Sequence, residues 1–140
     1  MLSMKYPVII SMALIMLLSA SSFRCSKDDT LNCDHAICTD MFAMIGVYIN
    51  DLSMTPEKLE VYTIRNSTGE KITLTQNETN LGVYFILDDS YRSKIAGKTE
   101  TFTLVGTKAG TQVFQQAYQI KADCCHVSKV SGKDSLRIPM

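Results

Sequence analysis

Apolar and polar residues alternate in short runs along most of this 140-residue chain, and turn residues separate one run from the next. In the run 59–65, for example, Leu59, Val61 and Thr63 share one parity. A period of two is typical of β-strands that bury one face. Because such runs recur at roughly 8 to 12 residues, and none alternates with a long helical pattern, the sequence predicts an all-β protein rather than a parallel α/β sheet.

About seven strands are expected, and this number favours an immunoglobulin-like antiparallel β-sandwich. The run 41–50 is apolar on both parities and is expected to be well buried, while Val83, Phe85 and Leu87 are expected to share one face of their strand. One short helical turn is expected within 88–97, capped at Asp89 or Ser90. The runs that can form these strands are 41–50, 59–65, 71–75, 82–87, 99–107 and 112–122, with two further short runs at 127–130 and 136–138.

The first 24 residues have the layout of a secretory signal, which predicts export. Lys5 is the only charge before an apolar run from Val8 to Leu18, and small residues follow it. This run is shorter than the roughly 20 apolar residues that span a bilayer. We therefore interpret residues 1–24 as a signal peptide, residues 25–32 as a polar tether and residues 33–140 as one domain. An uncleaved N-terminal anchor is the alternative.

The junction Cys25-Ser26-Lys27-Asp28-Asp29 resembles the surface-export signal of Bacteroidota lipoproteins, in which an acylated cysteine precedes a lysine and two acids. The resemblance implies lipid attachment at Cys25 and exposure on the outer membrane at the cell surface. Arg24 differs from the small residue that normally precedes a lipidated cysteine, so ordinary cleavage between Ala20 and Ser22 is the competing interpretation. The cysteine count favours lipidation, because five cysteines leave one unpaired and acylating Cys25 leaves four.

Net charge identifies no partner for the exported domain. The leader holds two of the 14 basic residues and none of the 14 acidic ones, so the rest of the chain carries a net charge of about −2. No basic stripe or long charged run is present in the sequence. Nucleic acid is therefore not an expected partner.

The four cysteines of the domain form two clusters that also contain both histidines, namely Cys33, His35 and Cys38 near its start and Cys124, Cys125 and His126 near its end. Disulfides are the favoured interpretation, since the cell surface permits them. Neighbouring cysteines rarely bond to each other, which leaves two pairings, Cys33–Cys124 with Cys38–Cys125 or Cys33–Cys125 with Cys38–Cys124. Adjacent residues of a strand face opposite ways, so either pairing requires a bulge or a strand end at Cys124-Cys125.

A metal site is the alternative use of these clusters, because thiolates and imidazoles are zinc ligands. Its possible ligands are Cys33, His35, Cys38, Cys124, Cys125 and His126. The spacing does not favour it, since an adjacent Cys-Cys cannot easily direct both sulfurs at one ion. Free or redox-active thiols are a third interpretation. No metal or other cofactor is predicted.

The chain resembles small immunoglobulin-like sandwich lipoproteins of Bacteroidota, in its export junction, in the segment 88–92 and in the segment 122–127 that runs into 130–132. The resemblance implies a fold and a location but no reaction. A Cys–His hydrolase could be written with Cys124 or Cys125, His35 and Asp123, but no helix N-terminus or glycine-rich elbow accompanies the thiols. We therefore predict no catalytic residues and no enzyme.

The expected function is that of a non-catalytic binding or structural module of the cell envelope, held to the membrane by its lipid and working with envelope protein partners. A glycan-binding accessory protein is the alternative function. The absence of tryptophan weakens a carbohydrate-stacking platform, although tyrosines could substitute. The tyrosines considered for such contacts are Tyr48, Tyr62, Tyr84, Tyr91 and Tyr118.

Overall fold

The computed structural model describes residues 31–52, 58–74 and 82–139. The predicted signal peptide, Cys25 and the tether up to residue 30 lie outside these residues. Among the described residues, no helix is both long and apolar enough to cross a membrane.

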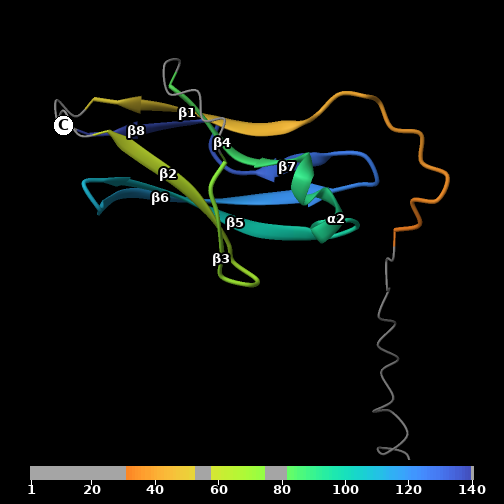
Figure 1. Cartoon of the computed structure of the whole chain (residues 1–140). Coiled ribbons are helices and arrows are strands. Elements are labelled where there is room, and N and C mark those ends of the chain that lie inside the picture. Colours follow the sequence, from red (N-terminus) through yellow and green to blue (C-terminus); the bar gives the residue numbers. More distant parts are fainter. Residues whose placement is uncertain (1–30, 53–57, 75–81, 140) are drawn as a thin grey trace, which may run out of the picture.

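The described chain forms two β-sheets that pack as a sandwich (Figure 1). The smaller sheet has the strand order β4-β1-β8 and the larger has the order β3-β2-β5-β6-β7. In chain order the strands are β1 (Met44–Asp51), β2 (Leu59–Arg65), β3 (Glu70–Ile72), β4 (Val83–Asp88), β5 (Thr99–Lys108), β6 (Thr111–Ala122), β7 (Val127–Ser131) and β8 (Ser135–Ile138).

The predicted all-β sandwich is confirmed, with eight strands in the described residues where about seven were expected. All pairings between neighbouring strands are antiparallel except one, because β8 runs parallel to β1. The inward residues of β6 alternate along the strand, since Tyr118, Ile120 and Ala122 are all buried. They join Phe102 and Leu104 of the neighbouring β5 in the core between the sheets.

Two expectations about the smaller sheet are wrong. The first is that β1 would be buried on both faces: Ile45, Val47 and Ile49 are buried, but Met44 and Tyr48 on the other parity are exposed. Among the described elements only the inner face of this sheet packs against a second layer, so half of each strand remains at the surface.

The second concerns the inward face of β4, which holds Tyr84, Ile86 and Leu87. Of the predicted residues Val83, Phe85 and Leu87, only Leu87 is buried, and the other two are half-buried. The register between β1 and β4 shifts between Ile45 and Gly46, so that Ile45 lies opposite Leu87 while Gly46 lies opposite Phe85. A bulge of this kind places one extra residue in a strand and reverses the parity beyond it. Ile86 and Leu87 are both fully buried as a result.

The predicted helical segment consists of a 3-10 turn, η2 (Asp89–Tyr91), followed by one turn of α-helix, α2 (Arg92–Ile95). Its N-cap is Asp88, whose carboxylate accepts a hydrogen bond from the backbone N–H of Ser90, and not Asp89 or Ser90 as expected. Asp89 is engaged in other contacts, described below. Ile95 is fully buried and fastens this short segment to the core, because a single helical turn is not stable alone.

Tyr118 provides a test of the core, because its buried hydroxyl finds no hydrogen-bond partner among the described residues. Burial, together with the charge of Asp134, raises the pKa of this phenol to about 12. An unsatisfied buried hydroxyl costs about 1 to 3 kcal/mol, so Tyr118→Phe is expected to raise the free energy of unfolding by about 1 kcal/mol. Urea denaturation of the two proteins measures the difference. A loss of stability in the variant would show that the hydroxyl has a partner.

Candidate functional site

Two disulfides join the N-terminal segment to the turn between β6 and β7. Cys33 bonds to Cys124 and Cys38 bonds to Cys125, with Cα–Cα distances of 5.3 and 5.2 Å. This is one of the two pairings that the sequence allowed. Cys124 and Cys125 lie in a bend after β6 ends at Ala122, so the strand end that two bridges require is present.

Asp123 shapes this turn through hydrogen bonds to its backbone. Its Oδ1 accepts hydrogen bonds from the backbone N–H groups of Cys125 at 2.7 Å and His126 at 2.8 Å. Its own N–H donates to the carbonyl of His126 at 3.1 Å. The hydrogen bonds from the backbone of His126 and Cys125 hold the pKa of the Asp123 carboxyl below its ordinary value. A local sequence, Asp-Cys-Cys-His, therefore builds the turn.

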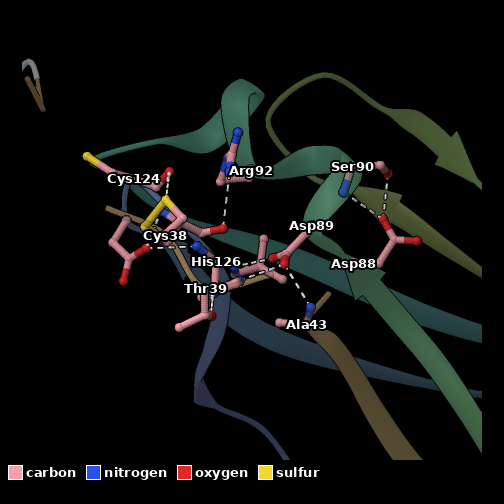
Figure 2. Close-up of polar contacts among 12 residues, drawn as sticks. Cys38, Thr39, Ala43, Asp88, Asp89, Ser90, Arg92, Cys124 and His126 are labelled. Atoms are coloured by element: carbon pink, nitrogen blue, oxygen red, sulfur yellow. Dashed lines mark hydrogen bonds and ion pairs between the residues drawn. A yellow bond between two sulfur atoms is a disulfide. The ribbon is translucent and has the colours of Figure 1, made fainter. Parts of the chain in front are cut away.

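Beside the disulfides, Asp89 connects the start of β1, the start of β7 and an imidazole (Figure 2). Its Oδ2 accepts from the backbone N–H of Ala43 at 2.7 Å and from Nδ1 of His126 at 2.8 Å. Its Oδ1 accepts from the backbone N–H of Val127 at 2.8 Å. The Asp89 side chain is only 9% exposed, so these three bonds replace water around a nearly buried carboxylate.

His126 extends this network to the N-terminal segment, since its Nε2 lies 3.0 Å from Oγ1 of Thr39. Arg92 on α2 reaches the same turn and donates to the carbonyl of Cys125 at 3.2 Å. We use the term N-terminal clamp for Thr39, Asp89 and His126 together with the two disulfides. The clamp joins the N-terminal segment to η2 and to the β6–β7 turn (Figure 2).

The hydroxyl, imidazole and carboxylate of the clamp follow one another in the order of a hydrolytic triad. Acyl transfer also requires N–H groups that converge on a developing oxyanion. Here the nearby backbone N–H groups point at carboxylates instead: those of Ala43 and Val127 donate to Asp89, and those of Cys125 and His126 donate to Asp123. These four N–H groups therefore serve to hold the clamp and the turn together.

A surface hollow of about 280 Å³ adjoins the clamp. Arg92 and His126 line it together with Asp40 and Asp89, and the apolar side chains of Met41 and Phe42 form another part of its wall. The walls therefore carry both signs of charge beside an apolar surface.

The disulfides bear on two alternative interpretations of the sequence, the metal site and the Cys–His hydrolase. All four domain cysteines are in disulfides, so none offers a thiolate to a metal or to a substrate. The metal-site alternative thereby loses its sulfur ligands, and the Cys–His hydrolase loses its nucleophile. Among the described residues no group of three or more His, Cys, Asp and Glu side chains could hold a metal ion. His35 lies exposed in the loop between Cys33 and Cys38.

Sequence reasoning found His126 and the cysteines but missed Thr39 and the role of Asp89. Asp89 was interpreted as a helix cap, and Thr39 carried no signal. The two contacts of His126 join residues 37 and 87 positions apart in the chain. No local sequence pattern indicates contacts at such separations, and the only signal at Asp89 was its place at the start of the predicted helical turn.

Comparisons with known proteins add no relative: no protein-family model matches the chain, and no curated protein or solved structure shows significant similarity to it.

The carboxylates of the site predict how stability depends on pH. Burial alone would raise the pKa of Asp89 above its ordinary 3.8, but the hydrogen bonds from His126, Ala43 and Val127 outweigh it and lower the pKa; that of Asp123 is also lowered. A carboxyl group whose pKa is lower in the folded state stabilises the protein above its unfolded pKa. That stability is lost as the pH falls through the folded value.

We therefore expect that these two groups change the free energy of unfolding little between about pH 7 and pH 5. As the pH drops further, below about 4, the free energy of unfolding should decrease. Urea denaturation at a series of pH values measures the profile. Asp89→Asn should flatten its acid limb. An acid limb of unchanged slope in the variant would contradict the assigned role of this carboxylate.

Proposed function

We propose that this protein is a lipoprotein, acylated at Cys25, exposed on the outer membrane at the cell surface, and acting as a non-catalytic binding or structural module of the envelope. The observation that carries the proposal is the use of the cysteines. Four of the five pair with one another in the structure, which leaves Cys25 as the odd cysteine of the sequence. Its position after an apolar leader and before Ser26-Lys27-Asp28-Asp29 is that of a lipidated residue.

The N-terminal clamp supports the same role. Cys33 lies only eight residues after Cys25, and its bond to Cys124 attaches the tether covalently to the β6–β7 turn. The second bridge, the Thr39–His126 contact and the hydrogen bond from Ala43 to Asp89 hold the following residues on the sandwich. A domain fastened in this way keeps a fixed end towards its anchor, and this suits a module that presents its other surfaces to partners.

Envelope proteins suit the available surfaces better than a glycan. Of the tyrosines considered for stacking on sugars, Tyr84 and Tyr118 are buried in the core, whereas Tyr48 is exposed on the outer face of β1. The tyrosines therefore do not form a shared platform. The outer face of the small sheet and the end of the sandwich away from the clamp are the surfaces that we assign to protein partners.

Intact mass of the protein isolated from its native membrane tests the proposal. We expect acylated Cys25 to Met140, with four thiols that react with an alkylating agent only after reduction. Cys25→Ser should release the protein from the membrane fraction, whereas Ser26→Ala should leave it acylated. A mass that corresponds to cleavage between Ala20 and Ser22 without lipid would refute the anchor, and specific retention on a glycan array would favour the glycan-binding alternative.

A further inference from the structure

Apolar side chains are exposed at the end of the sandwich where the N-terminal segment is clamped. Ile37 is 98% exposed, Met41 76% and Phe42 60%. We call these three residues the apolar loop. Ile37 lies between Cys33 and Cys38, which are both in disulfides, and Met41 and Phe42 lie between Cys38 and Ala43, whose N–H donates to Asp89. These bonds hold the loop on the domain surface without burying it. Exposed apolar side chains gathered at one end of a domain mark an interaction surface.

The tether places this surface next to the bilayer. Cys33 lies eight positions after Cys25, a distance along the chain that spans at most about 29 Å even when fully extended. Cys33 and Cys38 bond to neighbouring residues, so their Cα atoms are at most about 14 Å apart. In Figure 1 the segment after residue 31 lies at the end of the sandwich opposite the C-terminus. An acylated Cys25 would therefore keep the apolar loop close to the lipid.

Basic side chains accompany the loop at this end. Lys98 and Lys121 line a second hollow of about 250 Å³ together with one acid, Asp123, and with Leu31, which is itself 43% exposed. Lysine side chains near a membrane surface are attracted to lipid phosphates. Asp34 and Asp40 are also exposed in the segment, and they would remain in water at the headgroup level.

From these observations we infer that the apolar loop inserts Ile37, Met41 and Phe42 into the lipid interface and so orients the domain on the membrane. The inference rests on the proposed acylation of Cys25. Lipid is favoured over a protein as the occupant because the short tether leaves little space at this end for a folded partner. Insertion of the loop costs little conformational entropy, because the disulfides and the hydrogen bond from Ala43 to Asp89 already hold the segment in place.

The absence of tryptophan from the chain makes the inference directly measurable. Ile37→Trp in the acylated full-length protein introduces a single fluorophore at an exposed position. The variant is reconstituted in vesicles of phosphatidylcholine and phosphatidylglycerol whose acyl chains are brominated near the headgroup. We expect blue-shifted emission and the loss of most of the fluorescence relative to unbrominated vesicles. Phe42→Trp serves as a second reporter in the same loop.

Leu52→Trp is the matched control, since Leu52 is also exposed but follows the other end of β1, about 26 Å from Met44 along the strand. Its emission should be insensitive to bromine. Equal quenching at positions 37 and 52, or none at position 37 in protein of acylated mass, would overturn the inference while the proposed anchor stands. An unacylated mass would refute both. A blue shift at position 37 in native membranes but not in pure lipid would contradict lipid insertion and indicate that a protein partner covers the apolar loop.

Discussion

Replacing Cys33, Cys38, Cys124 and Cys125 together by serine is expected to lower the free energy of unfolding by about 7 kcal/mol. The first bridge closes a loop across 91 residues, and the chain-entropy relation assigns such a loop about 4 to 5 kcal/mol. The second bridge then closes a ring of only about eight residues, made of 33–38 and 124–125, and adds about 2 to 3 kcal/mol. Since whole domains have about 5 to 15 kcal/mol of stability, the quadruple variant should be barely folded.

The two bridges should not contribute additively. Either bridge alone still closes the long loop, so Cys33→Ser with Cys124→Ser, or Cys38→Ser with Cys125→Ser, is expected to lose only about 2 to 3 kcal/mol. The two double variants together should therefore lose less than the quadruple variant loses. Urea denaturation of the four proteins under non-reducing conditions measures these differences. Equal additive losses would mean that the two bridges constrain the unfolded chain independently.

The second large effect is expected at Asp89, where Asp89→Asn should lower the free energy of unfolding by about 2 to 3 kcal/mol. The amide keeps one oxygen for the N–H of either Ala43 or Val127, and its NH₂ group then faces the other donor. The charge-assisted bond to His126 is lost as well. Because Asp89 is nearly buried, water cannot readily replace these partners.

Asp88→Asn is the matched control for this variant. Asp88 is the neighbouring acid and caps η2 through the N–H of Ser90, a role that asparagine fulfils about equally well, so its loss should stay below about 0.5 kcal/mol. Limited proteolysis with the disulfides intact gives a second measurement, because loss of the clamp contacts should expose the segment 39–43. Equal stability of the two variants would show that Asp89 contributes no more than a surface cap.

The periodicity of the chain predicted most of the strands, and it did so because the residues of one strand face alternate locally. The buried parity of Leu59, Val61 and Thr63 in β2 followed directly from it. It failed in β4, where a bulge opposite Ile45 and Gly46 reverses the parity. It also failed in β1, because an apolar strand does not reveal whether a second layer covers its outer face.

The candidate site was predictable only in part. The two cysteine clusters indicated a connection between the start and the end of the domain, and simple elimination reduced three pairings to two. The choice of Cys33–Cys124 with Cys38–Cys125 depends on how the N-terminal segment crosses the β6–β7 turn. Thr39, Asp89 and His126 meet at the same place from three separate segments.

There is a physical reason why some of these features follow from the sequence and others only from the tertiary structure. Strand periodicity, turns and capping residues are encoded by residues close together in the chain, so the order of residues alone determines them. Disulfide partners, the buried carboxylate of Asp89 and the exposure of Ile37 arise where distant segments meet, and sheet register and topology decide which segments those are. Only the tertiary structure therefore shows that the two cysteine clusters and Asp89, which the sequence suggested as a helix cap, belong to one clamp.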